Sequence, residues 1–173
     1  MKTAKEKWHS MLSGGDLRSI GGANEVITRI HTQEDFDTLF GFLHSRDRLL
    51  VMRAADAIEK ITRKQGFYLD KHKESLLKLA AKATDKELKW HLAQLMPRLK
   101  LSDDETAAVF GLLEKWALDK IESKIVRANS VQALYEISGG NELLTKSFDE
   151  IRAALKKENV PSINARIKQL QGR

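Results

Sequence analysis

The sequence predicts an all-α protein built from about four stacked helix pairs, with a helical cap at the amino end. Apolar residues recur three and four positions apart along almost the whole chain, as in Leu50, Ala54 and Ala57, which is the spacing of one helix face. The alternation of apolar and polar residues that is typical of strands is nearly absent. One apolar pattern returns after 38 positions, which indicates a repeat architecture.

Composition limits the class of protein. A chain of 173 residues is long enough for one domain with a sizeable core, and 42% apolar with 31% charged residues excludes disordered and low-complexity chains. Because cysteine is absent, disulfides, thiolate metal sites and thiol nucleophiles are excluded, which favours a reducing compartment.

No targeting or membrane segment is predicted. The first twelve residues contain three lysines but are not followed by an apolar core of signal-peptide length. The uncharged run from Thr106 to Leu113 is far shorter than the roughly 20 apolar residues of a membrane helix. We therefore expect a soluble, cytoplasmic protein that does not interact with a membrane.

Short polar residues mark the starts of the predicted helices. Thr32 with Asp35 and Ser102 with Glu105 have the spacing of residues that cap the first turn of a helix. Together with the apolar periodicity, these signals predict helices near 33–44, 47–64, 71–83, 86–99, 103–117, 120–137, 142–157 and 160–170. Residues 1–31 are predicted to form the amino-terminal helical cap.

The repeat organises the rest of the chain. The pattern that begins at Leu50 begins again at Leu88 and Val126, and a shortened copy begins at Ile163. This register predicts one continuous repeat domain over 32–173, with repeats near 32–66, 70–100, 102–139 and 141–171. An aspartate precedes the second helix of each full repeat, at Asp47, Asp85 and Asp119. Since one helix pair cannot bury its apolar face alone, stacking of neighbouring pairs completes the core.

The repeated pattern resembles a known family. The segment from Val126 to Leu134, with Arg127, Ser130 and Ala133, resembles the second helix of a HEAT repeat. The segments 52–61 and 89–94 are similar to those of small bacterial HEAT-repeat proteins of no settled function. The resemblance covers about residues 33–171 and implies an armadillo-like solenoid, a right-handed α–α superhelix. It implies little about activity.

The repeat register also predicts an inner surface. The helix positions opposite the core set are Met52, Asp56, Glu59 and Arg63 in the first copy, then Trp90, Gln94 and Pro97, then Ala128, Gln132 and Tyr135. Amides can bond the backbone of a partner, and aromatic side chains supply contact area at small entropic cost. The candidate partner-binding residues on this concave face and its flank are Arg53, Asp56, Trp90, His91, Gln94, Gln132 and Tyr135.

These residues predict a non-catalytic scaffold that binds a peptide or protein partner. A purely structural interpretation stays open for some of them. Arg53 and His91 could bridge adjacent repeats, Arg53 could pair with Asp56, and Trp90 could pack against the next repeat. The sequence leaves the oligomeric state open.

Catalytic and metal-binding motifs are missing. The sequence contains no HExxH, GxSxG or phosphate-binding loop motif, and its five histidines lie far apart without ligand spacing. We therefore predict no catalytic residue, no metal site and no cofactor.

Nucleic-acid binding is the alternative function. Residues 46–100 hold 14 Lys and Arg against 7 Asp and Glu, so this region carries the whole basic excess. Lys71, Lys78 and Lys82 are predicted to form a stripe on the convex side of helix 71–83, and phosphate binding by such a stripe is favoured by counterion release. The carboxylates of Asp56 and Glu59 on the concave side oppose phosphate binding there.

An enzymatic alternative rests on a second resemblance. Certain DNA glycosylases for alkylated bases are built from similar helical repeats and use concave Trp, Asp and Arg side chains. That resemblance implies Trp90, Asp56 and Arg53 in those roles. This chain is shorter than members of that family by a repeat or more, which leaves less concave surface to hold a duplex.

Overall fold

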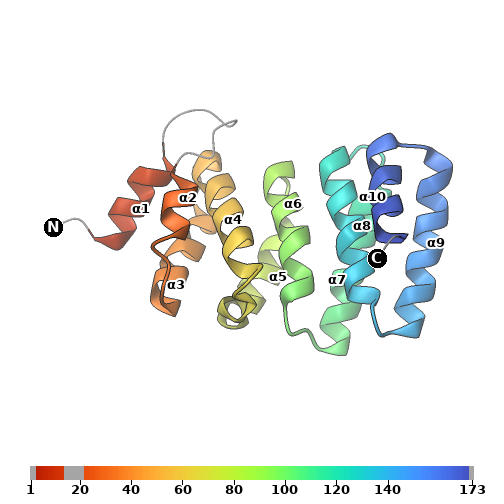
Figure 1. Ribbon diagram of the computed structural model, residues 1–173, viewed down its shortest axis with the longest axis horizontal. Coiled ribbons are helices and arrows are strands. Elements are labelled where there is room, and N and C mark those ends of the chain that lie inside the picture. Colours follow the sequence, from red (N-terminus) through yellow and green to blue (C-terminus); the bar gives the residue numbers. More distant parts are fainter. Residues whose placement is uncertain (1–2, 14–21, 172–173) are drawn as a thin grey trace. The chain divides into compact units, whose positions relative to one another are not determined.

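The computed structural model describes residues 3–13 and 22–171, and those residues form helices and turns without any strand (Figure 1). The all-α prediction is therefore confirmed for the part of the chain that is described. The chain divides into two compact units, Met1–His72 and Lys73–Arg173, here called unit 1 and unit 2. The predicted boundary at residue 31 stays a prediction, and residues 14–21 of the predicted cap lie outside the described ranges.

Unit 1 is built around helix α4, which contacts α1, α2 and α3. Its elements are α1 (Ala4–Leu12), α2 (Ala23–Ile27), α3 (Gln33–Gly41), α4 (Arg48–Thr62) and the 3₁₀ segments η1 (Phe42–His44) and η2 (Gly66–His72). The hydroxyl of Thr32 accepts from the Asp35 N–H, and the Asp35 carboxylate accepts from the Thr32 N–H, as the sequence predicts. These reciprocal bonds satisfy amide groups that a helix start otherwise leaves without partners.

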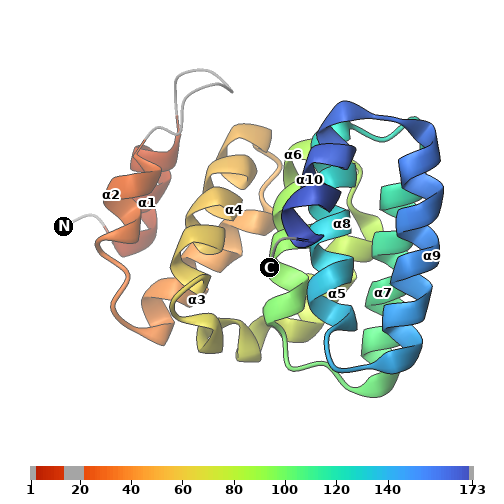
Figure 2. The same cartoon turned by 45° about the vertical axis from the view of Figure 1, so that its right-hand side comes forward.

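Unit 2 contains six α-helices in its described part. They are α5 (Lys73–Lys82), α6 (Lys86–Leu95), α7 (Asp103–Leu118), α8 (Lys124–Ser138), α9 (Glu142–Glu158) and α10 (Pro161–Gln171), with the 3₁₀ segment η3 (Met96–Arg98) after α6. Helix α8 contacts α6 and α10, and it also contacts α7 and α9, which contact each other (Figure 2). The second helices of the predicted pairs thus form one row, α6–α8–α10, and α7 and α9 belong to the other row.

The predicted core positions are buried in both units. Leu50, Ala54, Ala57 and Ile58 of α4 are at most 2% exposed, and the corresponding residues of α6 and α8 are buried as well. Val126 of α8 and Ile163 of α10 are fully buried. The apolar register therefore identified the packing face of each second helix correctly.

Helix α8 begins later than the sequence predicts. Its expected start at residue 120 is replaced by a turn, in which the Asp119 carboxylate accepts from the Ile121 N–H at 2.9 Å. The hydroxyl of Ser123 then accepts from the Val126 N–H at 3.3 Å and caps the first turn of α8. Asp119 precedes α8 as the sequence predicts, but it caps the end of α7, and Ser123 caps the start of α8.

A positively charged side chain at one repeat position connects neighbouring repeats of unit 2. Lys89 of α6 and Arg127 of α8 occupy equivalent positions, 38 residues apart. Lys89 forms an ion pair with Glu122, just before α8, and Arg127 pairs with Glu158 at the end of α9, at 2.7 Å. The Lys89 ammonium also lies 5.8 Å from the centre of the Trp116 ring, close enough for a cation–π contact.

No helix in the described ranges combines the length and the apolar character needed to cross a membrane.

Candidate partner-binding surface

The seven predicted partner-binding residues divide between the two units. Arg53 and Asp56 lie on α4 in unit 1. The other five lie on the α6–α8–α10 row of unit 2, with Trp90, His91 and Gln94 on α6 and Gln132 and Tyr135 on α8.

Arg53 is a core residue of unit 1. Its side chain is 1% exposed, and its Nη1 donates to the carbonyl oxygen of Leu12 at 2.8 Å. Leu12 ends α1, where the last carbonyl groups have no partner inside the helix and attract a cation. Arg53 thus attaches the end of α1 to α4, and its burial leaves it out of the surface proposed below.

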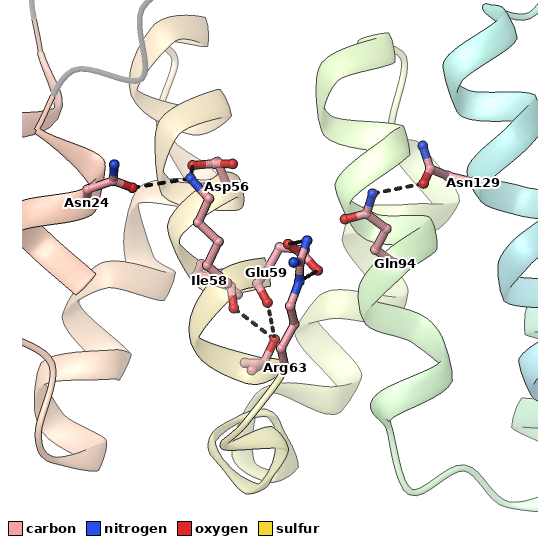
Figure 3. Close-up of polar contacts among 9 residues, drawn as sticks. Asn24, Asp56, Ile58, Glu59, Arg63, Gln94 and Asn129 are labelled. Atoms are coloured by element: carbon pink, nitrogen blue, oxygen red, sulfur yellow. Dashed lines mark hydrogen bonds and ion pairs between the residues drawn. The ribbon is translucent and has the colours of Figure 1, made fainter. Parts of the chain in front are cut away.

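Asp56 is half-buried and engaged within unit 1. Its carboxylate accepts from Lys60 Nζ at 2.7 Å, one helical turn further along α4. The same ammonium group reaches Asn24 Oδ1 on α2 at 3.3 Å, so Lys60 bridges α2 and α4 (Figure 3). Asp56 therefore contributes to a polar contact between two helices.

Glu59 departs from its predicted exposed position. The sequence places Glu59 opposite the core, but its side chain is only 3% exposed. Its two carboxylate oxygens accept from Nε and Nη2 of Arg63, each at 2.8 Å, in a forked ion pair (Figure 3). The hydrogen bond to Glu59 raises the pKa of the Arg63 guanidinium, so Arg63 stays charged. Contact with the more exposed Arg63 explains how a carboxylate is tolerated at this depth.

A row of amide side chains connects the helices α6, α8 and α10. Gln94 Nε2 donates to Asn129 Oδ1 at 2.8 Å, which joins α6 to α8 (Figure 3). Arg166 Nη1 of α10 donates to Gln132 Oε1 at 3.1 Å, which joins α10 to α8. Gln94 and Gln132 occupy the same repeat position and are both half-buried. We call Gln94, Asn129, Gln132 and Arg166 the amide row.

The sequence interpretation did not include Arg166 among the site residues. The signal was available, because the fourth copy of the repeat begins at Ile163 and this register gives Arg166 the position of Asn129. Asn129 is 7% exposed, and its Nδ2 donates to the Ile125 carbonyl at 2.8 Å. Gln94 and Gln132 therefore each contact the same position of the next repeat, which is Asn129 for Gln94 and Arg166 for Gln132.

Trp90 and His91 lie next to the amide row on α6. Their rings meet edge to face, with centroids 5.2 Å apart and planes at 88°. His91 is 6% exposed and belongs to the interior, whereas Trp90 is half-buried. The Trp90 Nε1 atom is buried, and no side chain or carbonyl in the described ranges accepts its proton. Only the remaining part of the indole ring is available for contact with a partner.

Tyr135 lines a small cavity at the carboxyl end of α8. The cavity has a volume of about 260 Å³ and is lined by Tyr135, Glu136, Ser138, Gly139, Thr145, Phe148, Asp149 and Arg152. The Tyr135 ring packs against Phe148, with centroids 5.9 Å apart. This volume is below the roughly 300–1,000 Å³ that is typical of small-molecule sites. It is suited to a single side chain of a partner.

The predicted lysine stripe is not one helix face. Lys71 lies in η2 of unit 1, whereas Lys78 and Lys82 lie on α5 of unit 2. Lys71 Nζ donates to Asp37 at 2.5 Å, and Lys78 lies 3.5 Å from Glu74. Two of the three cations are therefore already paired with carboxylates, which reduces the charge offered to phosphate.

Asp37 is the centre of a polar cluster in unit 1. It accepts from Gln33 Nε2 at 2.9 Å, from His72 Nε2 at 2.6 Å and from Lys71. Burial opposes ionisation, but the hydrogen bonds from Gln33, Lys71 and His72 outweigh it and lower the pKa of Asp37 to about 2. The His72 ring is stacked on Phe40 at 4.0 Å, so the cluster attaches η2 to α3.

Replacing Asp37 by asparagine is expected to destabilise unit 1 in a pH-dependent way. The folded-state pKa of about 2 lies below the ordinary value of 3.8, so the carboxylate stabilises the fold above pH 3.8 and loses this effect as the pH falls towards 2. Because the group is partly solvent-exposed, we expect a loss of about 1 kcal/mol at pH 7 that vanishes near pH 2. The loss is measured by urea unfolding of the wild type and of Asp37→Asn at pH 7, 5, 3 and 2. The exposed Glu34→Gln on the same helix is the control, and a pH-independent difference would contradict the assignment.

Within residues 3–13 and 22–171, no group of three or more His, Asp and Glu side chains is arranged to hold a metal ion. Comparison of the chain with protein-family models, with curated proteins and with solved structures found no match.

Proposed function

We propose that this chain is a non-catalytic protein-interaction module whose partner binds along the α6–α8–α10 row of unit 2. The observation that carries this proposal is the amide row, in which Gln94 and Gln132 repeat the same contact to the next helix. These inter-helix bonds hold both amides in a defined orientation, so a partner meets donors and acceptors that are already ordered. The partner is a peptide or protein segment whose backbone groups bond these amides.

Two neighbours of the amide row add contact area. The half-buried Trp90 ring lies at one end, and Tyr135 with its cavity of about 260 Å³ lies further along α8. Aromatic side chains of this kind contribute a large share of the binding energy at interfaces. We further propose that the helix pairs form a HEAT-like solenoid in which the α6–α8–α10 row lies on the concave side.

The two alternative functions receive less support. The lysines predicted to bind phosphate are divided between the two units, and Lys71 and Lys78 have carboxylate partners. The glycosylase-like roles require an accessible Arg53, but its guanidinium is buried against the Leu12 carbonyl.

Alanine at Gln94, and separately at Trp90, is expected to weaken partner binding about five- to tenfold or more, as for a buried anchor at an interface. The measurement is capture from a cell lysate at low and physiological salt, identification of the captured molecule, and titration of that molecule with each variant. Lys78→Ala, on the exposed side of α5, is the matched control. Urea unfolding of each variant separates lost binding from lost folding.

The salt dependence distinguishes the functions. A partner held by amide and aromatic contacts changes its affinity little between the two salt concentrations, because exposed charges are not the main source of binding. Capture of nucleic acid that survives Trp90→Ala but disappears when Lys71, Lys78 and Lys82 are all changed to glutamine contradicts the proposal. Such binding falls steeply with salt, by about 0.9 in log affinity per log salt for each neutralised phosphate.

A further inference from the structure

Unit 2 has a second surface, on the other row of helices. A groove of about 460 Å³ is lined by residues of α7 and α9. These two helices lie next to each other (Figure 2). None of the residues of the amide row lines it, so this groove is separate from the surface assigned above. Its floor includes Phe110 and Ile151, which are 5% and 4% exposed.

Small residues keep the groove open. Ala107, Gly111 and Ala154 line it and are solvent-exposed. A Cβ atom added at Gly111 would meet no atom within 4 Å, so the space above this residue is free. Glycine lowers helix stability by roughly 0.5–1 kcal/mol relative to alanine and fills no space here. Small residues in this position let the backbone of another helix approach closely.

Helix α7 has no polar face along part of its length. The run from Thr106 to Leu113 contains no charged residue, and its exposed members that line the groove are Ala107 and Gly111. A helix that is apolar on all sides is normally buried on all sides. The exposed side of α7 therefore lacks the apolar neighbour that its sequence indicates.

The charged residues of the groove indicate which kind of partner helix fits it. The charged residues that line the groove are Glu114 from α7 and Glu150 from α9, one from each helix. Two copies of the chain that meet through this groove would bring four carboxylates together, which disfavours self-association. We propose that the groove between α7 and α9 binds a basic amphipathic helix of a partner protein. The apolar side of that helix covers Gly111, Ala107 and Ala154, and its lysine or arginine side chains pair with Glu114 and Glu150.

The direct test uses a synthetic probe. The probe is an 18-residue helical peptide of leucine and lysine, and one control peptide has glutamate in place of lysine. A second control keeps the composition but alternates the two residues, which prevents an amphipathic helix. We expect saturable binding of the first peptide alone, measured by fluorescence anisotropy, and weaker binding as salt rises. Because the chain has a net charge of +6, non-specific attraction does not favour a basic peptide. Equal binding of all three peptides would overturn the proposal.

Substitutions in the groove locate the binding. Gly111→Leu fills the open space and is expected to weaken binding about tenfold or more, whereas Ala108→Leu, exposed on the same helix but outside the groove, leaves it unchanged. Loss of binding in both variants, or in neither, contradicts the proposal. Circular dichroism and urea unfolding confirm that both variants fold.

A second pair of variants tests the charges. The double change Glu114→Gln and Glu150→Gln is expected to weaken binding about three- to tenfold, the range of two partly exposed ion pairs. Asp104→Asn with Glu142→Gln removes the same charge from the same two helices outside the groove and serves as the control. Equal affinity of the two double variants contradicts the assignment of Glu114 and Glu150.

Two further measurements address other occupants. Light scattering during size-exclusion chromatography is expected to show a monomer for both the wild type and Gly111→Leu. A dimer of the wild type that Gly111→Leu abolishes would assign the groove to a second copy of the chain. Trp90→Ala and Gln94→Ala are expected to leave peptide affinity unchanged. A loss in those variants places the peptide on the amide row and overturns the proposal for the groove.

Discussion

Replacing Arg127 by methionine is expected to lower the free energy of unfolding of unit 2 by about 3 kcal/mol. The side chain is 3% exposed, with Nε donating to the Ala117 carbonyl and Nη2 to Glu158, at 2.8 and 2.7 Å. Methionine fills a similar volume but leaves the Glu158 carboxylate without its cation. It also leaves the Ala117 carbonyl, in the last turn of α7, without this donor. Breaking such a pair from one side is costly because the Glu158 carboxylate, whose side chain is 18% exposed, loses its cation while it remains largely removed from water.

The measurement is urea unfolding followed by tryptophan fluorescence in a Trp8→Phe background. The remaining tryptophans, Trp90 and Trp116, both lie in unit 2, so the signal reports that unit. Arg152→Met is the matched control, because its partner Asp149 is 53% exposed and such surface pairs contribute about 0–1 kcal/mol. Adding Glu158→Gln to Arg127→Met is expected to recover part of the loss. An Arg127→Met effect no larger than that of Arg152→Met would contradict the structural role assigned to this pair.

Apolar periodicity and cap residues predicted most of the helices. Helical spacing places Leu88, Leu92 and Leu95 on one face, and an apolar face of this kind normally packs against the core. All three residues are at most 7% exposed. The start of α7 was predictable because Ser102 and Glu105 satisfy each other locally, within four residues. A contact between residues this close in the chain can be predicted from the sequence alone.

The depth of polar residues was not predictable in the same way. Arg53 finds its acceptor 41 residues away, at Leu12, and nothing near Arg53 in the sequence indicates that carbonyl. Glu59 lies opposite the apolar face of α4 but is buried all the same. Helical periodicity identifies only one packing face, whereas helix α8, for example, contacts both α6 and α10 as well as α7 and α9.

The basic excess of residues 46–100 is a related case. Lys71, Lys73 and Lys89 belong to that region, but their carboxylate partners are Asp37, Glu105 and Glu122, which lie outside it. A count over a sequence window therefore overstates the positive charge that reaches the surface.

The start of α8 was not predictable for a different reason. Asp119 and Ser123 are both suitable cap residues, and the turn between them decides which one begins the helix.

Deleting residues 139–173 is expected to cost unit 2 several kcal/mol, a large part of the stability of an ordinary domain. The deletion removes α9 and α10, which both contact α8. Leu155, Ile163 and Ile167 are at most 1% exposed, so their removal uncovers an apolar side of α8 and reduces solubility.

The measurement compares the urea midpoint and the solubility of the full chain, of the chain without 139–173 and of a chain without 161–173. Removing 161–173 alone takes away α10 and Arg166, so we expect a smaller shift of the midpoint in the same direction. The larger deletion also removes Glu158, and Arg127→Met is therefore expected to cost less in the truncated chain than in the full chain. An unchanged midpoint after removal of 139–173 would mean that α9 and α10 do not stabilise α8, and it would argue against a stack of repeats in which each pair supports its neighbour.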